Sequence, residues 1–402
     1  MTLPDDAPSL TSGEPGERPR WWIYRGTGER LHDTTLGELL PPPPPWRRFD
    51  GSPVLPPPPA GEEEDEEAVR RLGAHPSARR PSAFARREAE MVNAALVLRR
   101  PLLVSGRPGT GKSSLAYRIS RELRLGPVLR WHITSRSTLQ RGLYEYDAIG
   151  RVHDAAALRA ATGDGVEAPT APTSSVASTA PAGPAGAVAP AEASEERAAA
   201  SPAVGNYIQL GPLGTALLPY AQPRVLLIDE LDKSDLDLAN DLLSVFEEGS
   251  FPIPELLRAR RRHPSVKVMT YDPEGEAEIT GGMVTCRAFP VIVITSNSER
   301  EFPPAFLRRC LVLDMPEPDE NDLADMLAAH LGPEVAGQWG GELISRFADR
   351  RREGVLSIDQ LLNAAYLTTS TRPAEDENGD LPRLVEALWH RLDGTGHVPG
   401  IR

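Results

Sequence analysis

The sequence predicts an α/β fold in which a doubly wound parallel sheet is followed by a small helical domain. Between Pro101 and Ile294, short continuous apolar runs alternate with helical patterns, as expected for strands buried on both faces. A glycine-rich turn separates the first apolar run from the helical pattern after it. From about Pro318 onward only helical patterns appear.

The expected strands and helices follow one another along the chain. The strand-like runs are residues 101–105, 128–133, 225–228 and 290–294. Residues 113–125 predict a helix, because Leu115, Ile119 and Leu123 recur at four-residue spacing on one face. Residues 236–248 predict another, whose inward side chains are Leu238, Leu242, Val245 and Phe246. Strands and helices in alternation favour the doubly wound sheet.

Composition narrows the classes of function. A length of 402 residues suggests two or three folded units. The net charge of −13 argues against broad nucleic-acid or anionic-membrane binding. Cys286 and Cys310 are too few for a disulfide framework or a multi-cysteine zinc site. No apolar run approaches the ~18–20 residues of a membrane span, and residues 1–6 lack signal-peptide features. The expected location is the reducing cytoplasm.

Two regions are expected to be disordered. Residues 1–80 contain proline runs at 41–45 and 56–59 and an acidic run at 62–67, which favour a largely disordered arm. Residues 155–205 consist mainly of Ala, Pro, Ser, Thr, Gly and Glu, and have almost no large apolar side chains to offset the entropy of ordering. The aromatic segment 21–24 in the arm predicts either a docking segment for a partner or a small strand packed on the body.

The glycine-rich turn matches the phosphate-binding pattern G-x-x-x-x-G-K-[ST] at residues 106–113. Its glycines let successive N–H groups point into one concavity, with the positive end of the following helix behind them. Lys112 would reach the β- and γ-phosphates of a triphosphate, and the Ser113 hydroxyl would bind Mg²⁺. The predicted phosphate-binding residues are Gly106, Pro108, Gly109, Thr110, Gly111, Lys112, Ser113 and Ser114.

Two carboxylates follow the apolar run at residues 225–228. Asp229 and Glu230 would lie at the ligand edge of the sheet, where the carboxyl ends of parallel strands meet. Asp229 would hold Mg²⁺ through its water shell, and Glu230 would orient or deprotonate the attacking water. A water-activating carboxylate favours hydrolysis over transfer to a hydroxyl substrate.

The buried run at residues 290–294 is followed by a polar stretch at residues 295–297. The Asn297 amide is placed to position the attacking water. Shortly afterwards, Arg308 and Arg309 form a pair that could reach a neighbouring subunit and stabilise charge on the transferring phosphoryl group.

With these motifs in this order, residues 84–366 resemble an AAA+ ATPase, most closely the MoxR branch of the dynein-related, McrB-like group. The resemblance identifies the phosphate loop as Walker A, Asp229 and Glu230 as Walker B, Asn297 as sensor 1, and Arg309 rather than Arg308 as the arginine finger. It divides the chain into a Pro-rich arm (1–80), an α/β nucleotide-binding domain (81–316, with the insertion 155–205), and a helical lid with a C-terminal tail (317–402). It also implies a hairpin between residues 251 and 289.

The resemblance implies ATP and Mg²⁺ as cofactors, assembly into a ring, often a hexamer, and chaperone-like remodelling of a protein partner. Proteins of this branch commonly work with von Willebrand factor A domain proteins. One position departs from the family pattern: no arginine stands near residues 357–360, where a sensor 2 arginine is often found, so that role stays unassigned.

Several alternatives remain. A nucleotide-dependent switch or scaffold in a multi-component, defence-like system would use the same loop without turnover. A small-molecule kinase would not need Glu230, Asn297 and Arg309 in that order. A GTP- or DNA-linked motor of the McrB type is disfavoured by the overall charge, although residues 258–263 form a local basic run whose simpler interpretation is a solvated loop.

Overall fold

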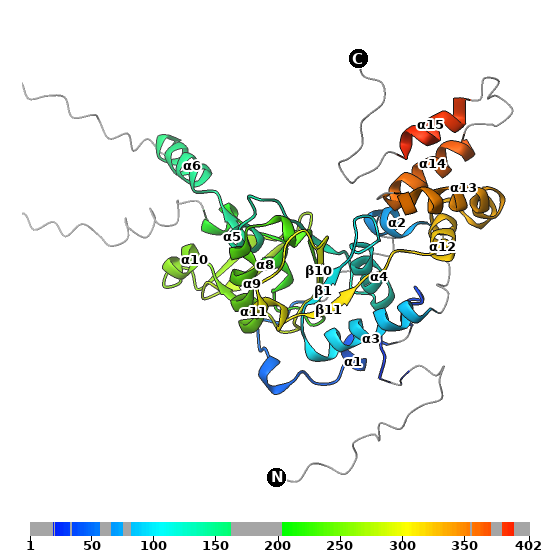
Figure 1. Ribbon diagram of the computed structural model, residues 1–402. Helices are drawn as coiled ribbons and strands as arrows, with labels where there is room; N and C mark the ends of the chain where they lie inside the picture. The colour runs from blue at the N-terminus through cyan, green and yellow to red at the C-terminus, as the bar shows by residue number, and fades with distance from the viewer. Residues whose placement is uncertain are drawn as a thin grey trace, which may run out of the picture.

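The computed structural model describes residues 19, 21–32, 34–56, 66–74, 82–161, 203–353, 356–370 and 380–389. Its centre is a five-stranded parallel sheet with the strand order β11-β1-β10-β5-β2 (Figure 1). The strands are β1 (Leu102–Ser105), β2 (Leu129–His132), β5 (Val225–Asp229), β10 (Val291–Ser296) and β11 (Leu311–Asp314). The expected α/β fold with a parallel sheet is confirmed, and β11 is an edge strand that the sequence patterns did not indicate.

Side chains of this sheet alternate between two hydrophobic cores. Leu102 and Val104 of β1 pack with the helices on one face, whereas Leu103 belongs to the core on the other face. The register continues these layers, because Leu103 pairs with Ile294 and Ile294 pairs with Ile228. Helices α3 and α4 supply the first core, and α8 and α9 supply the second. Covering both faces is what continuous apolar strands require.

Two helices of the α/β domain, α4 and α9, lie where the sequence predicts them, and the others were not indicated by the sequence. The helices of this domain are α3 (Ala83–Leu98), α4 (Ser114–Leu123), α5 (Leu139–Leu143), α6 (Ala148–Ala161), α8 (Pro212–Ala216), α9 (Leu236–Glu248), α10 (Pro254–Ala259) and α11 (Pro304–Leu307). Helix α6 stands away from the body (Figure 1). The expectation of disorder over the insertion 155–205 does not hold for residues 155–161, which are helical, nor for residues 203–205, which lead into η2 (Val204–Tyr207). Residues 162–202 of that insertion lie outside the described residues.

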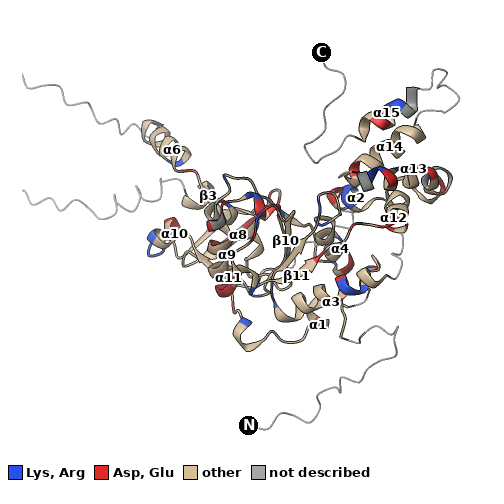
Figure 2. Ribbon diagram, in the orientation of Figure 1, with Lys and Arg blue, Asp and Glu red and all other residues tan. Residues whose placement is uncertain are grey.

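Smaller strands surround the main sheet. One sheet has the order β3-β4-β7-β8, and β6 pairs with β9. These strands are β3 (Tyr144–Tyr146), β4 (Ile208–Leu210), β6 (Ser250–Pro252), β7 (Ser265–Met269), β8 (Glu276–Thr280) and β9 (Met283–Thr285). The antiparallel pair β7–β8 is the hairpin expected between residues 251 and 289. The basic run at 258–263 ends α10 and begins the exposed turn after it (Figure 2).

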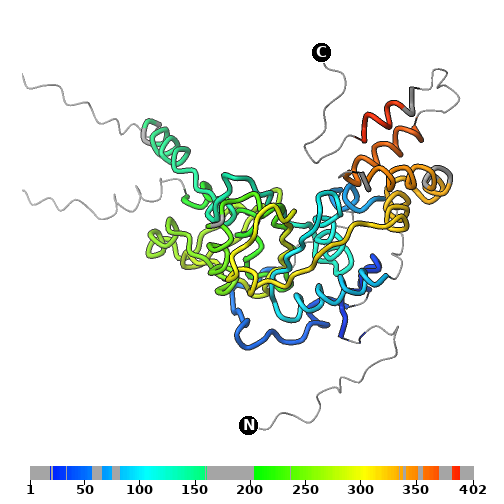
Figure 3. The backbone as a smooth tube through the Cα atoms, in the orientation of Figure 1, coloured from blue at the N-terminus to red at the C-terminus, as the bar shows by residue number. Residues whose placement is uncertain are grey.

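Part of the amino-terminal arm is packed rather than disordered. Residues 21–56, with α1 (Leu36–Leu39) and η1 (Pro45–Arg47), run along the α/β domain (Figure 3). Tyr24 and Leu36 are fully buried, so the aromatic segment packs on the body, though as an irregular stretch and not as a strand. Buried apolar side chains and hydrogen bonds to α3 hold the arm there. The expectation of disorder therefore does not hold for residues 21–32, 34–56 and 66–74, and residues 1–18, 20, 33, 57–65 and 75–80 lie outside the described part of the chain.

The carboxyl-terminal helices form a separate core. They are α12 (Glu320–Leu331), α13 (Pro333–Glu353), α14 (Ile358–Ser370) and α15 (Asp380–Leu388). Leu323, Phe347 and Leu361 are buried in this core, and the Trp389 ring meets Phe347 edge-on at 5.8 Å between centroids. Helix α2 (Glu66–Leu72) contacts both α4 and α12 and so connects the lid to the α/β domain (Figure 1). Among the described residues, no helix is long and apolar enough to cross a bilayer.

Candidate nucleotide site

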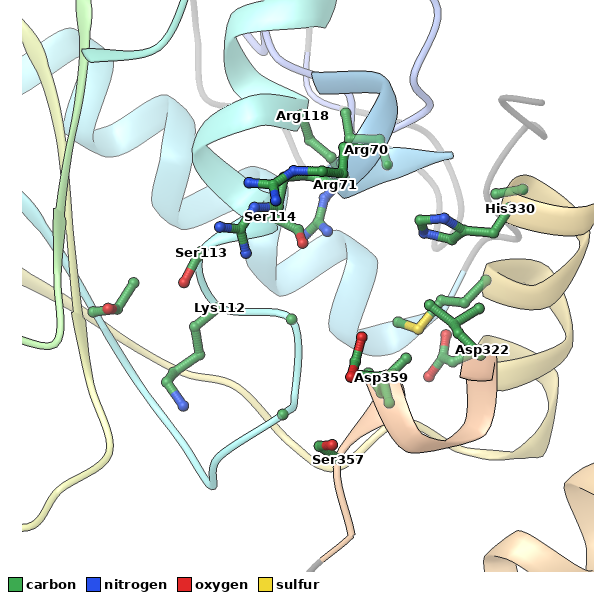
Figure 4. A pocket seen from close by; sticks show the side chains of 18 of the residues that line it. Arg70, Arg71, Lys112, Ser113, Ser114, Arg118, Asp322, His330, Ser357 and Asp359 are labelled. Carbon is green, nitrogen blue, oxygen red and sulfur yellow. The ribbon is translucent and has the colours of Figure 1, made fainter. Parts of the chain in front are cut away.

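A cavity of about 590 Å³ lies between the carboxyl ends of the sheet strands and the helical lid. Figure 4 shows the loop that carries Lys112, Ser113 and Ser114 on one side of this space and Ser357 and Asp359 of the lid on the other. The cavity brings together most of the predicted site residues: Pro108, Gly109, Gly111, Lys112, Ser113, Ser114, Asp229, Glu230 and Asn297. Gly106, Thr110 and Arg309 do not line it. A cleft of this size is typical of a small-molecule site.

The loop before α4 has the backbone shape that its glycines allow. Gly109 and Gly111 have φ angles of 74° and 84°, in the left-handed region that favours glycine. Lys112 Nζ donates hydrogen bonds of 2.8 Å to the carbonyls of Gly106 and Arg107, so its ammonium group lies inside the curl of the loop. Burial lowers the pKa of Lys112, opposed by the nearby carboxylates of Asp232, Asp229 and Glu230. Thr110 is buried beneath the loop, where its hydroxyl donates to Arg107 O at 3.0 Å.

Asp229 ends β5 directly beside the start of α4. The Ser113 hydroxyl donates a 2.6 Å hydrogen bond to Asp229 Oδ1, and the Thr295 hydroxyl donates to the same oxygen at 2.8 Å. Arg130 on β2 pairs with Asp229 Oδ2 at 3.0 Å. Burial alone would raise the pKa of this carboxyl, but the three donors outweigh it, and the pKa of Asp229 is lowered. Asp229 is therefore held as a carboxylate.

The Ser113 hydroxyl oxygen and the Asp229 carboxylate oxygens are suitable ligands for a magnesium ion. Mg²⁺ prefers hard oxygen ligands and is commonly held by one or two protein groups together with water and phosphate oxygens. The Ser113 hydroxyl and the ionised Asp229 carboxylate provide such ligands beside the phosphate loop. The donor set thus agrees with the metal that the sequence predicts.

Glu230 occupies a left-handed backbone position immediately after β5, with φ of 63°. Its N–H donates to Thr295 Oγ1 at 2.8 Å, which fixes the turn against β10. Its carboxylate is partly exposed at the cavity and pairs with Lys233 Nζ at 2.7 Å. The side chain is anchored at its base and is accessible to water at its tip.

Asn297 follows β10 and also lines the cavity. The Asn297 N–H donates to Asp232 Oδ2 at 2.9 Å, and the Glu299 N–H donates to the same oxygen at 3.2 Å. Asp232 is buried just after the Glu230 turn, so one carboxylate fixes the chain that carries Asn297. These hydrogen bonds fix the backbone at Asn297 relative to the turn at Glu230.

Arg309 lies elsewhere on the molecule. It follows α11 at the amino end of β11, pairs with Glu247 at the end of α9, and donates to Ala305 O at 3.2 Å. Arg308 is exposed, and its carbonyl accepts from Arg100 at 3.2 Å. Neither arginine reaches the cavity of its own chain.

On the lid side of the cavity, the acidic residue Asp359 stands in the segment where related proteins often have a sensor 2 arginine. Ser357, Ile358 and Asp359 line the cavity at the start of α14. The Arg351 side chain is mostly buried near Glu317 and does not line the cavity. Other cations do line it, and Figure 4 shows Arg70, Arg71 and Arg118 grouped above Ser114.

No sequence motif indicates several of the residues that form the site. Arg130 and Thr295 become partners of Asp229 only because β2 and β10 flank β5, and strand order cannot be derived from apolar runs. Gly26, Thr27 and Gly28 of the arm also line the cavity, held by N–H donation from Gly26 and Gly28 to the Glu122 carboxylate at 3.2 and 3.1 Å. A run of small residues in a proline-rich arm gives no indication of this.

Fold and cavity together define a P-loop nucleoside-triphosphatase. The family model described as "AAA domain (dynein-related subfamily)" matches residues 101–310. The chain therefore belongs to this family of AAA domains and is a P-loop ATPase; members of the family generally bind ATP with Mg²⁺ and oligomerise. Among solved structures, it is similar to PCH-2 of C. elegans, with 14% identity, a TM-score of 0.34, and coverage of 76% of this chain and 67% of that one. No curated protein matches its sequence.

Proposed function

We propose that this protein is a MoxR-like, Mg²⁺-dependent ATPase that hydrolyses ATP between the subunits of a ring and uses the cycle to remodel a protein partner. The observation that carries the proposal is the contact between the Ser113 hydroxyl and Asp229, beside Lys112 and under the lid. It brings the phosphate loop after β1 and the acid at the end of β5 together in one cavity. Cys286 and Cys310 are free, buried thiols, which agrees with a cytoplasmic location.

Binding would use the loop and the two oxygens beside it. The N–H groups from Gly109 to Ser114 and the Lys112 ammonium would hold the phosphates, once that ammonium leaves the loop carbonyls that it now contacts. The Ser113 hydroxyl and the Asp229 carboxylate would hold Mg²⁺. When bound, the ion supplies positive charge against the phosphate oxygens.

Hydrolysis would use the two polar strand ends. Glu230 would accept a proton from the attacking water, while the Asn297 amide would orient that water toward the γ-phosphate. The left-handed turn at Glu230 and the bond from its N–H to Thr295 support these roles, because they fix where the carboxylate starts. Release of Glu230 from Lys233 would free the carboxylate to act as a base.

The position of Arg309 supports a site shared between subunits. A guanidinium outside the cavity of its own chain can stabilise the transferring phosphoryl group only in a neighbouring copy. Each subunit would then lend one arginine and receive another, as closed rings with head-to-tail interfaces allow. A hexamer is the expected ring.

The exposed face of α6 supports a protein partner, such as a von Willebrand factor A domain protein. Ile149 and Val152 are 73% and 67% exposed, one helical turn apart on a helix that stands away from the body (Figure 1). The polar side of α6 is fixed to the body by the contact from Tyr207 to Asp154 at 2.6 Å. An apolar face presented in this way is typical of a contact surface.

Size measurement with nucleotide tests the proposal directly. We expect light scattering to show a larger assembly with a nonhydrolysable ATP analogue and Mg²⁺ than without them, and phosphate release to require Mg²⁺. The Lys112→Ala variant is the control, and it should bind no nucleotide and stay small. An unchanged size, together with no phosphate release from ATP, would contradict the proposal.

A further inference from the structure

A second cavity, of about 360 Å³, lies at the other edge of the sheet from the nucleotide site. Its walls include Pro223, Pro290 and Val291, which stand at the amino ends of β5 and β10. Residues 41–43 of the arm and the last turn of α3 close the other sides. The arm therefore completes a pocket on the α/β domain that has no part in the nucleotide site. We name it the arginine cavity.

Four arginines line the arginine cavity, and no acidic residue does. They are Arg47, Arg99, Arg100 and Arg287. Within the described part of the chain, none of the four has a carboxylate oxygen within 4.0 Å of its guanidinium nitrogens. Arg47 is also buried, and charged side chains are rarely buried unless they are paired.

Backbone carbonyls, and not carboxylates, position three of these guanidinium groups. Arg47 donates to Phe246 O and lies 5.4 Å from the centre of the Phe289 ring. Arg99 donates to Pro41 O at 3.0 Å, and Arg100 donates to Arg308 O at 3.2 Å. A guanidinium has five N–H donors, so these contacts leave donors available. The Arg287 side chain has no hydrogen-bond or ion-pair partner among the described residues.

The surroundings of Arg47 and Arg99 disfavour their charged forms. Burial lowers the pKa of Arg47, and the neighbouring cation Arg100 lowers it further. Burial also lowers the pKa of Arg99. A bound anion would compensate both charges, because a nearby opposite charge stabilises the ionised form.

We propose that the arginine cavity binds a compact polyanion carrying two or more phosphate or carboxylate groups. Arginine forks bind both groups through paired N–H···O bonds. A volume of about 360 Å³ falls at the small end of the range for small-molecule sites. Leu40, Leu96 and Phe289 provide an apolar wall beside the cations, as such sites usually have.

The arginine cavity also touches both segments that hold Arg309. Arg100 contacts the carbonyl of Arg308, and Arg47 contacts the carbonyl of Phe246, the residue before Glu247, which pairs with Arg309. Binding of an anion would therefore act on the position of Arg309. This regulatory consequence rests on the proposed function, whereas the binding itself does not.

Isothermal titration calorimetry of the full-length Lys112→Ala protein separates the two questions. This variant removes the other phosphate site, so inorganic pyrophosphate and citrate can each be titrated without nucleotide or Mg²⁺, at low salt. We expect saturable binding of one anion per chain, and the stronger of the two ligands identifies phosphate or carboxylate as the preferred group. Adding Arg99→Gln and Arg287→Gln should weaken binding by at least about tenfold.

Two further variants keep the result interpretable. Arg287→Gln alone removes a side chain without internal partners, so it should fold normally and still weaken binding several-fold. The pair Arg261→Gln and Arg262→Gln removes the same charge from exposed positions after α10 and should leave the affinity unchanged. Absence of saturable binding by either anion, or equal affinity with and without Arg287, overturns the proposal. Anion binding by the Lys112→Ala protein, together with no ATP hydrolysis by the wild-type chain, would overturn only the proposed function.

Discussion

Gly109 of the phosphate loop packs against Ser357 at the start of lid helix α14. A Cβ built on Gly109 would lie 2.8 Å from Ser357 Cα and 2.9 Å from Ser357 Cβ, closer than real Cβ contacts come. The loop and the lid therefore meet without a side chain between them. The turn that carries the phosphate-binding pattern also fixes how near the lid can approach.

Gly109→Ala should destabilise the nucleotide-free protein through both backbone strain and the lost approach to the lid. Gly111→Ala is the matched control, because Gly111 also has a positive φ, of 84°, but no atom within 4 Å of a built Cβ. Each alanine is expected to cost about 1–2 kcal/mol for the left-handed backbone. Gly109→Ala should cost roughly 1 kcal/mol more, since overpacking adds to it. Equal urea midpoints for the two variants would show that the lid contact is not tight.

Glu230→Gln should retain ATP binding and lose hydrolysis. The amide keeps the shape of the side chain but cannot accept the proton, so we expect kcat to fall by roughly 10²- to 10⁴-fold. Single-turnover phosphate release and ATP affinity should be measured together. Glu248→Gln, an exposed substitution on α9, is the control and should behave as wild type. Unchanged turnover in Glu230→Gln would remove Glu230 from its proposed role.

Arg309→Ala should bind ATP but hydrolyse it slowly, by about 10³-fold or more, since it lacks the charge that a neighbour would receive. Mixing it with Lys112→Ala protein should restore part of the turnover. In mixed rings, an intact nucleotide site of one subunit can face an intact Arg309 of the other. Arg308→Ala, which alters the exposed neighbour, should keep most of the activity. Mixtures no faster than the sum of their components would argue against shared sites.

Apolar periodicity in the sequence predicts the main strands and two helices of the α/β domain. It does not predict which side chains form hydrogen bonds and ion pairs at the site. The helix predicted at 236–248 is α9 with the same bounds, because its inward side chains repeat at helical spacing. The phosphate loop and the two acids were found because each follows a buried strand in sequence. Arg130 and Asp232 were missed because they reach the site from a neighbouring strand and a short turn. The arm was misjudged because its proline runs hide residues such as Tyr24, whose burial depends on distant partners on α3.

Asn93→Ala should destabilise the fold by detaching residues 23 and 24 from α3. Asn93 is fully buried, and its Oδ1 accepts from the N–H groups of Ile23 and Tyr24 at 2.7 and 3.0 Å, while its amide donates to Tyr24 O at 2.7 Å. Leaving these buried groups unpaired is expected to cost about 1–3 kcal/mol. The free energy of unfolding in urea measures this loss. Asn240→Ala, on the exposed side of α9, should change it by no more than about 0.5 kcal/mol.

Helix α2 contacts both α4 of the α/β domain and α12 of the lid. Gly73, directly after it, comes so near the lid that a Cβ would lie 2.2 Å from Ala329 O. A swing of the lid on nucleotide exchange must either carry α2 with it or break this contact. A displacement of the lid would in that way also move residues 66–73 against α4, the helix that follows the phosphate loop.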